Sequence, residues 1–403
     1  MKQIRFRLIL LIVAITLQIA WYAVLMVSFI RTPGKLEGAD FLTYYSVGRV
    51  ASQHGLSRVY DLDLEAAAQA ETAGVAVGVQ YVLPPNHPPF LYPFLEFLAR
   101  LSYREAYIGY TALLGTLVIV GLIFLGSALE HNGWPRGQVY VTLVGVLLFE
   151  PLFMSILKGQ DSALLLLGGF LWLSGLSRND DRLAGLGLSM TLIRPQIALL
   201  LGLPYLCRQR KVFFWFLVGA IGLVLYSFLQ VGGSGMADFT QILTLSAGGE
   251  GYGMAESAMF NFTGLLLRLA PRLDIGLVHA IGWGFFAAAL ASLCVLWGRS
   301  KTIGFRHIAL SVTLSLFASP HLHYHDLSLL AVPLVGLGIA GVAAGRLTVS
   351  RAAALPMTVS VLLLFCEIWD PARFTVPYLL MAALIISTWL KEKRLSKLPK
   401  LAT

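Results

Sequence analysis

Four clusters of polar and ionisable residues stand at the ends of long apolar runs in this sequence. The first is Asp40, and the others are Lys158-Gly159-Gln160-Asp161, Arg194-Pro195-Gln196 and His321-Leu322-His323-Tyr324-His325-Asp326. An ionisable side chain near the centre of a bilayer costs about 2.5–3.5 kcal/mol, so each one needs a reason to be there. A carboxylate at an interface can act as a general base, and fixed cations and imidazoles can hold an anionic group such as phosphate. The clusters therefore indicate a catalytic or binding site.

Each charged residue also has a structural interpretation. Asp40 stands where it can cap the helix that follows it, and the roles of cap and base are compatible. Lys158 can extend its stem to the membrane interface, the commoner reason for a lysine at a helix end. Arg194 precedes a helix-breaking proline and lacks that route, which favours a role in binding phosphate. Gln160 and Gln196 add neutral hydrogen-bonding groups two residues after each cation.

Three histidines alternate in His321-x-His323-x-His325-Asp326. Alternate residues converge only on a strand, whereas this run joins two predicted helices, so a metal site is the minority interpretation. A polar lip that hydrogen-bonds phosphate or hydroxyl groups is favoured, and a solvated loop is the alternative. Asp61-Leu62-Asp63 resembles a metal-binding Asp-x-Asp pair, yet it opens an amphipathic run and is typical of a helix cap. We expect neither a metal ion nor another cofactor.

Composition limits the class of protein that can position these clusters. The chain has 403 residues, of which 57% are hydrophobic and 13% charged. An ordinary soluble domain has about 25% charged residues, so we expect an all-α polytopic membrane protein that forms one integral membrane domain over residues 1–403. Apolar runs lie near 8–30, 104–129, 138–157, 161–177, 183–206, 212–231, 274–298, 303–319, 327–345, 352–369 and 373–390. Counting 183–206 as two helices gives about twelve.

The charges predict how these runs cross the membrane. The net charge of +9 is concentrated in alternate short loops, as the positive-inside rule requires, and it indicates topology rather than a nucleic-acid partner. Both termini are expected in the cytoplasm. The run 183–206 has arginines at both ends, so it must enter and return through a turn at Arg194-Pro195. All four polar clusters then fall on the extracytoplasmic side, which suggests one cavity there.

Two segments are expected to lie outside the membrane. Residues 31–103 form the first extracytoplasmic loop, with amphipathic stretches at 42–54 and 62–73 that predict helices along the interface. Residues 232–258 are rich in glycine and predict a mobile extracytoplasmic loop that closes over substrate. The stretch 259–270 predicts a short interfacial helix.

Taken in order, these motifs resemble the polyprenol-phosphate-mannose-dependent glycosyltransferases of family 87. The resemblance covers roughly 38–333 of the chain. It rests on Gly38-Ala39-Asp40-Phe41-x-x-Tyr44-Tyr45, Val59-Tyr60-Asp61, Pro88-Pro89-Phe90, Lys158-Gly159-Gln160, Arg194-Pro195-Gln196 and Ser319-Pro320 through Asp326-Leu327. Two departures stand out, because Arg194 occupies a position where lysine is common in the family and Asn86-His87 is an unusual insertion.

The resemblance implies a multi-span GT-C fold and the transfer of one sugar, usually mannose, from a polyprenyl-phosphate donor to an extracytoplasmic glycolipid or glycan acceptor, with inversion. Asp40 would be the general base. The donor phosphate would be bound by Lys158, Arg194, His321, His323 and His325. Substrate would also contact Tyr44, Tyr45, His87, Gln160, Gln196 and Asp326. Membrane lipids are the remaining expected partners, and no nucleotide is required.

The main alternative is a membrane transporter or lipid flippase, because a proline-broken hairpin is also typical of transporter helices. A transporter should, however, place polar residues near the midplane and on both sides. A glycan ligase or polymerase of related architecture is a third possibility, and only the product would separate it from a transferase of single sugars.

Overall fold

The computed structural model describes residues 2–32, 34–35, 40–75, 77–78, 81–248, 256–369 and 373–395. Within these ranges the chain forms α-helices and short 3-10 helices and no strand. The expected all-α fold is therefore confirmed for the described part of the chain. Gly38 and Ala39, which precede Asp40 in the first motif, lie outside it.

In the described part of the chain, five stretches are long and apolar enough to cross a membrane, or six if one bent pair counts as a single span. The pair is α7 (Arg136–Leu147) and α8 (Glu150–Lys158), which meet at 44°. The five stretches lie in α6 (Tyr103–His131), α13 (Arg210–Gly248), α15 (Ile275–Arg299), the 3-10 helix η6 (Tyr324–Leu330) with α17 (Ala331–Ala343), and α18 (Val349–Ala353) with α19 (Leu355–Ile368). These helices support a membrane protein.

The expected count of about twelve spans is not confirmed. Several predicted spans are helical but give described apolar helices of only 10–17 residues, short of the roughly 20 that an untilted span needs. They are in α1 (Lys2–Arg31), α9 (Ser162–Ser177), α16 (Phe305–Ala318) and α20 (Thr375–Leu395).

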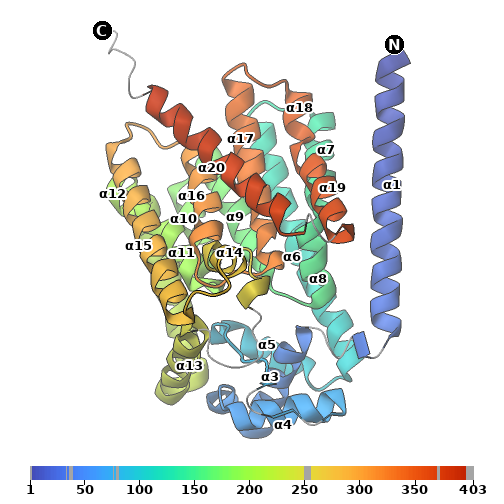
Figure 1. Ribbon diagram of the computed structural model, residues 1–403, viewed down its shortest axis with the longest axis vertical. Helices are drawn as coiled ribbons and strands as arrows, with labels where there is room; N and C mark the ends of the chain where they lie inside the picture. Colours follow the sequence, from blue (N-terminus) through green and yellow to red (C-terminus); the bar gives the residue numbers. More distant parts are fainter. Residues whose placement is uncertain are drawn as a thin grey trace.

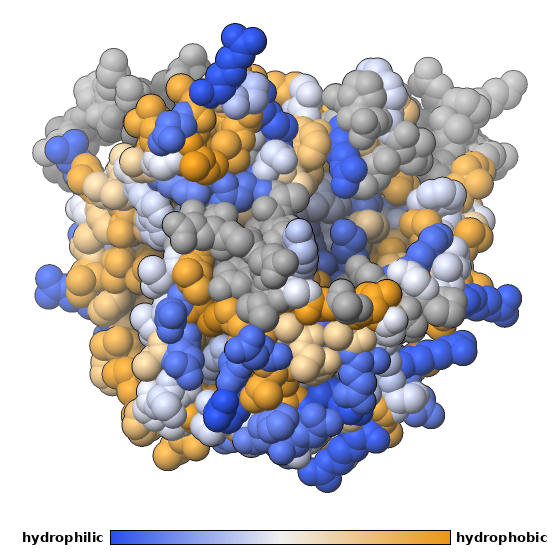
Figure 2. Space-filling model, turned by 60° about the horizontal axis from the view of Figure 1, so that its bottom comes forward, coloured by the Kyte–Doolittle hydropathy of each residue, from blue (hydrophilic) through white to orange (hydrophobic). Residues whose placement is uncertain are grey.

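The helices form a bundle with a separate helical layer at one end (Figure 1). That layer contains α3 (Phe41–His54), α4 (Leu62–Ala73) and α5 (Tyr92–Leu98). The start of α1 and the last described turn of α20 lie at the opposite end of the bundle. Seen from the side of the layer, the lower part of the surface is rich in hydrophilic side chains, and apolar side chains gather on the left of the view (Figure 2).

The run 183–206 enters the bundle and returns. It contains α10 (Asp181–Ser189), the 3-10 helix η4 (Met190–Ile193), α11 (Pro195–Gly202) and α12 (Pro204–Arg208). Arg194 has φ −125° and ψ 85°, so the helix breaks at the residue before the proline. Arg182, at the start of α10, lies 5.2 Å from the ring centroid of Trp215, near the start of α13. The two ends of the run therefore lie at the same end of the bundle, as predicted.

The helices predicted at 42–54 and 62–73 are confirmed as α3 and α4. Asp61 caps α4, because its side chain accepts hydrogen bonds from the backbone N–H groups of Asp63 and Leu64 at 3.1 and 3.3 Å. This is the structural role that the sequence favoured over metal binding. The location of α3 and α4 along a membrane interface stays a prediction.

The prediction of a loop over 232–258 is wrong for 233–248, which are helical and form the second part of α13. Gly232 has φ 69° and ψ −175°, a non-helical conformation that glycine adopts without a steric penalty, so α13 consists of two helical parts that meet at a kink there. Beyond the kink, Phe239 and Ile242 are buried, and the Phe239 ring packs 5.3 Å from that of Tyr60. Residues 249–255 lie outside the described part of the chain. The helix predicted near 259–270 is α14 (Phe262–Leu269).

Candidate active site

A cavity of about 470 Å³ lies between the helical layer and the bundle. Side chains from all four polar clusters line it, although the clusters are separated by more than a hundred residues in places. The predicted site residues in its lining are Asp40, Tyr44, His87, Lys158, Gln160, Arg194, Gln196, His321, His323, His325 and Asp326. The structure thus brings together eleven of the twelve residues singled out from the sequence.

Asp40 enters the cavity wall from the first turn of the layer. It precedes α3, but its side chain makes no capping hydrogen bond to that helix. Its position is fixed by its neighbour Phe41, which is fully buried and packs against Gly159. Gly159 has φ +70°, and a Cβ atom there would lie 2.6 Å from the Cβ of Phe41. The glycine of the Lys158-Gly159-Gln160 motif therefore allows α3 to sit against the end of α8.

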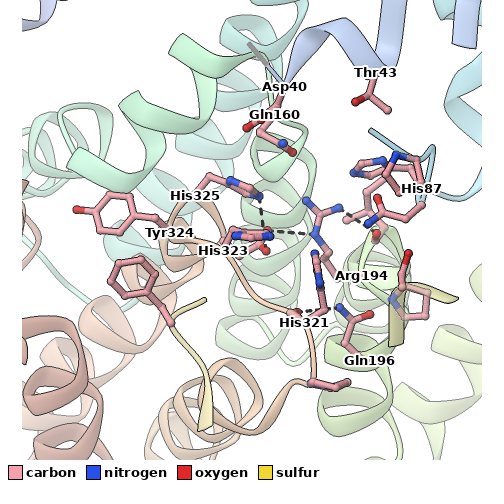
Figure 3. A pocket seen from close by; sticks show the side chains of 18 of the residues that line it. Asp40, Thr43, His87, Gln160, Arg194, Gln196, His321, His323, Tyr324 and His325 are labelled. Carbon is pink, nitrogen blue, oxygen red and sulfur yellow. Dashed lines mark hydrogen bonds and ion pairs between the residues drawn. The ribbon is translucent and has the colours of Figure 1, made fainter. Parts of the chain in front are cut away.

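Arg194 lies in the wall between the three histidines and His87 (Figure 3). Its guanidinium is 2.8 Å from a carboxylate oxygen of Asp161 and 3.1 Å from one of Asp326, and both aspartates are buried. Ser162 also donates a hydrogen bond to Asp326, at 3.1 Å. Because two carboxylates share one guanidinium, the positive charge of Arg194 is already offset within the protein.

His87 connects the layer to this ion-pair group. Its Nε2 atom lies 2.9 Å from the hydroxyl of Tyr44 and 3.5 Å from a carboxylate oxygen of Asp161. The backbone carbonyl of His87 accepts hydrogen bonds from Tyr60 and Tyr92, at 3.0 and 2.7 Å, which hold the proline-rich segment in place. Burial lowers the pKa of His87 to about 4, an effect that Asp161 partly opposes, so its imidazole is neutral at pH 7.

The three alternate histidines lie side by side along one wall. The ring centroids of His321 and His323 are 4.8 Å apart, and those of His323 and His325 are 5.8 Å apart. Burial lowers the pKa of both His321 and His323, so these imidazoles offer neutral hydrogen-bonding groups rather than charge. In the described part of the chain, no group of three or more His, Cys, Asp or Glu side chains is placed to hold a metal ion.

The loop that carries these histidines is fixed from several sides. The side chain of Asn261 donates hydrogen bonds to the carbonyls of Ser319 and Pro320, at 2.8 and 2.9 Å. Gln196 donates one to the carbonyl of His321 at 3.2 Å. The Gln196 side chain is therefore partly engaged in positioning the loop.

Two further parts of the wall differ in character. Lys158 and Arg373 line the cavity with exposed side chains. An apolar part is formed by side chains of α11, α13 and α15, namely Leu199, Leu243, Trp283 and Phe286. Leu199 and Trp283 are 43% and 41% exposed, which is high for large apolar residues in a cavity wall.

Tyr45 is the one predicted residue that does not line the cavity. It is buried, and its hydroxyl donates a hydrogen bond to the carbonyl of Leu101 at 2.8 Å. Consecutive residues in a helix are about 100° apart around the axis, and in α3 this rotation directs Tyr45 away from the cavity that Tyr44 lines. The interpretation of Tyr45 as a substrate contact is not supported by this position.

The sequence analysis missed several residues of the site. Asp161 directly follows the Lys158-Gly159-Gln160 motif. Nothing else in the sequence indicates that its carboxylate pairs with Arg194. Tyr324 lines the cavity, and its hydroxyl donates a hydrogen bond to the buried carboxylate of Glu150. Arg373 had no signal, because it stands at the start of the apolar run 373–390 and outside every motif.

The model of glycosyltransferase family 87 matches residues 86–320, more than half of the chain. The matched region includes His87, Lys158, Gln160, Arg194 and Gln196. Neither a curated protein nor a solved structure matches the chain.

Proposed function

Because this chain belongs to glycosyltransferase family 87, we propose that it transfers one mannose from a polyprenyl-phosphate donor to a glycolipid or glycan acceptor outside the cytoplasm. The observation that carries the proposal is the shared cavity, where a carboxylate, two exposed cations and an apolar wall come together. This combination fits a substrate with a sugar, a phosphate and a lipid chain.

In the proposed reaction Asp40 is the general base. Its carboxylate takes the proton from the acceptor hydroxyl while that oxygen forms a bond to the anomeric carbon of the sugar. The bond from that carbon to the phosphate oxygen breaks, and polyprenyl phosphate leaves from the opposite face, so the anomeric configuration inverts. Asp40 supports this role because its side chain lines the cavity and is not used as a helix cap.

The leaving phosphate gains negative charge as the bond breaks, so cations in a low-dielectric cavity stabilise the transition state. Lys158 supplies an exposed ammonium for this purpose. Arg194 holds Asp161 and Asp326 in place, and because these two carboxylates offset its charge, its role is to position the site rather than to neutralise the phosphate. His321, His323 and His325 donate hydrogen bonds to phosphate oxygens or sugar hydroxyls.

The remaining polar residues contact the substrates. Tyr44, His87, Gln160 and Gln196 line the cavity on the side of the helical layer and the broken helix, where they can hydrogen-bond hydroxyl groups. Asp326 acts through Arg194 and the adjacent histidines. The apolar wall on α11, α13 and α15 offers a place for the first isoprene units of the donor.

The proposed orientation follows from the charges. With the basic loops in the cytoplasm, both termini are cytoplasmic and the cavity opens on the extracytoplasmic face of the cell membrane. The proposed reaction uses no metal ion or cofactor, so chelation with EDTA should leave transfer unchanged.

The test is transfer of radiolabelled mannose from polyprenyl-phosphate mannose to a membrane lipid extract, with the protein purified and placed in lipid nanodiscs. Asp40→Asn should lose transfer by about 10²–10⁴-fold without loss of folded protein. Asp63→Asn is the matched control, because Asp63 is an acid of the same layer that does not line the cavity. Full transfer by Asp40→Asn would show that Asp40 is not the base, and absence of transfer by the wild-type protein with every polyprenyl-phosphate sugar would refute the proposed donor class.

A further inference from the structure

The charge balance around Arg194 indicates that other cations bind the phosphate. The guanidinium contacts Asp161 at 2.8 Å and Asp326 at 3.1 Å, and these three buried groups carry a formal net charge of −1 when all are ionised. Such a group does not attract a second anion. Breaking a buried ion pair is costly, so a phosphate cannot displace either aspartate without loss of binding energy.

Two other basic side chains face the same cavity. Lys158 is the last residue of α8, and Arg373 lies two residues before α20, so they come from well-separated elements of the bundle. Both are exposed, and neither forms an ion pair with a carboxylate in the described part of the chain. Together with Asp40 they are the exposed or partly exposed charged groups of the lining.

The surroundings of Arg373 hold it at the cavity wall. Its guanidinium carbon lies 5.8 Å from the centroid of the Phe374 ring. Phe374 stacks on Phe260 with centroids 5.0 Å apart, and Phe260 lies 5.1 Å from Tyr324. Both Phe260 and Tyr324 line the cavity. Arg373 therefore extends from an aromatic cluster that is continuous with the wall beside His323 and His325.

We propose that Arg373 and Lys158 together bind the phosphate of the lipid-linked donor. This assignment rests on the proposed function and identifies which cations serve it. A donor phosphodiester carries one negative charge, and the departing phosphomonoester carries more, so two exposed cations match the product better than one does. Arg373 offers a planar fork that can contact two phosphate oxygens, and Lys158 offers a compact charge near Asp40.

The decisive measurement is direct binding of a fluorescent short-chain polyprenyl phosphate to the purified protein in nanodiscs, with the corresponding uncharged polyprenol as the second probe. Arg373→Gln should weaken polyprenyl-phosphate binding by about tenfold or more and leave polyprenol binding unchanged. Arg373→Lys should retain part of the affinity, because it keeps the charge but not the fork. Lys158→Gln should behave like Arg373→Gln, and the double variant should bind both probes equally.

Arg272→Gln is the matched control. Arg272 is an exposed arginine in the turn between α14 and α15, and it does not line the cavity. Its substitution should leave both affinities at the wild-type value. Inorganic phosphate at the same concentration should compete only weakly, since the proposed ligand is the lipid phosphate. Equal competition by inorganic phosphate would overturn the assignment to the lipid donor.

Failure of this assignment is distinguishable from failure of the proposed function. If Arg373→Gln folds and binds polyprenyl phosphate as tightly as the wild type, the assignment is wrong even though mannose transfer continues. If the wild type binds polyprenyl phosphate through Arg373 but transfers no sugar, the phosphate-binding assignment is supported and the proposed reaction is wrong. In an active enzyme, Arg373→Gln should also raise the donor KM and reduce inhibition by polyprenyl phosphate.

Discussion

Substitution of Gly159 by alanine tests how the carboxylate of Asp40, the proposed base, is positioned. The residue joins two motifs, because it follows Lys158 and lies directly against Phe41, the neighbour of Asp40. The added Cβ would stand 2.6 Å from the Cβ of Phe41, a separation at which one of the two elements must move. Phe41 is buried among aromatic rings, including that of Tyr110 at 5.2 Å, so it cannot turn aside without disturbing them.

The expected magnitude has two parts. Alanine at φ +70° costs about 1–2 kcal/mol as a left-handed residue, and overpacking against Phe41 adds about 1–3 kcal/mol. Gly133→Ala separates the parts, because Gly133 has φ +76° and nothing lies within 4 Å of the position of its Cβ. Gly133→Ala should lose only the stability that the left-handed backbone conformation of alanine costs. A displacement of Asp40 by about 1 Å should reduce transfer by as much as about 10²-fold.

The assay compares mannose transfer and thermal inactivation for the two alanine variants in nanodiscs. Gly159→Ala should lose more stability than Gly133→Ala and should lose kcat, whereas Gly133→Ala should keep the wild-type kcat. Equal activity of the two variants would show that the contact with Phe41 does not set the position of Asp40. A compensating change of Phe41 to a smaller residue should restore part of the packing in the Gly159→Ala background.

Two other predictions concern buried charge. Arg194→Met should destabilise the protein by about 3–5 kcal/mol, because it leaves two buried aspartates without their cation. Lys158→Met, which removes an exposed cation from the same cavity, should leave the thermal inactivation temperature unchanged, and a similar loss in both variants would contradict the ion-pair argument. Burial raises the pKa of Glu65, in α4, to about 8, so the folded state holds this proton more tightly than the unfolded state does. The stabilisation is complete below about pH 4.5 and is lost as the pH rises towards 8. Glu65→Gln should flatten this pH dependence of the inactivation temperature, whereas Glu71→Gln, at an exposed acid of the same helix, should keep the wild-type slope.

The helices of the bundle could be predicted because hydrophobicity is a local signal. Apolar runs, proline at the first turn of α11 and an aspartate before α4 each act over a few residues, and the structure has helices at all of them. The meeting of the four polar clusters could also be predicted, because alternation across a membrane places the ends of successive helices on the same side. Neither inference needed the packing between helices.

The partners within the site could not be predicted in the same way. Arg194 was assigned to phosphate because the proline that follows it leaves its side chain no route to the interface, whereas its partners in the structure, Asp161 and Asp326, are 33 and 132 positions away. The segment 232–248 was assigned to a loop from its glycines, and its helix is stabilised by the distant Tyr60, which packs on Phe239. Tyr44 and Tyr45 are adjacent and chemically identical, so only the packing of α3 decides which of them faces the cavity.

The helical layer and the bundle contribute different groups to the cavity. Tyr44, His87, Asp161, Arg194 and Asp326 form a continuous chain of contacts from the helical layer to the bundle, with separations of 2.8–3.5 Å. This chain fixes the layer, and with it Asp40, relative to the helices that carry Lys158 and the histidines. In the proposed reaction the base must lie on the face of the anomeric carbon opposite the leaving phosphate, because the transfer inverts that carbon. This requirement is met when the base lies on the layer and the phosphate-binding cations lie on the bundle. The buried ion pairs of Arg194 then contribute to the proposed reaction, because they hold the two parts at a constant separation.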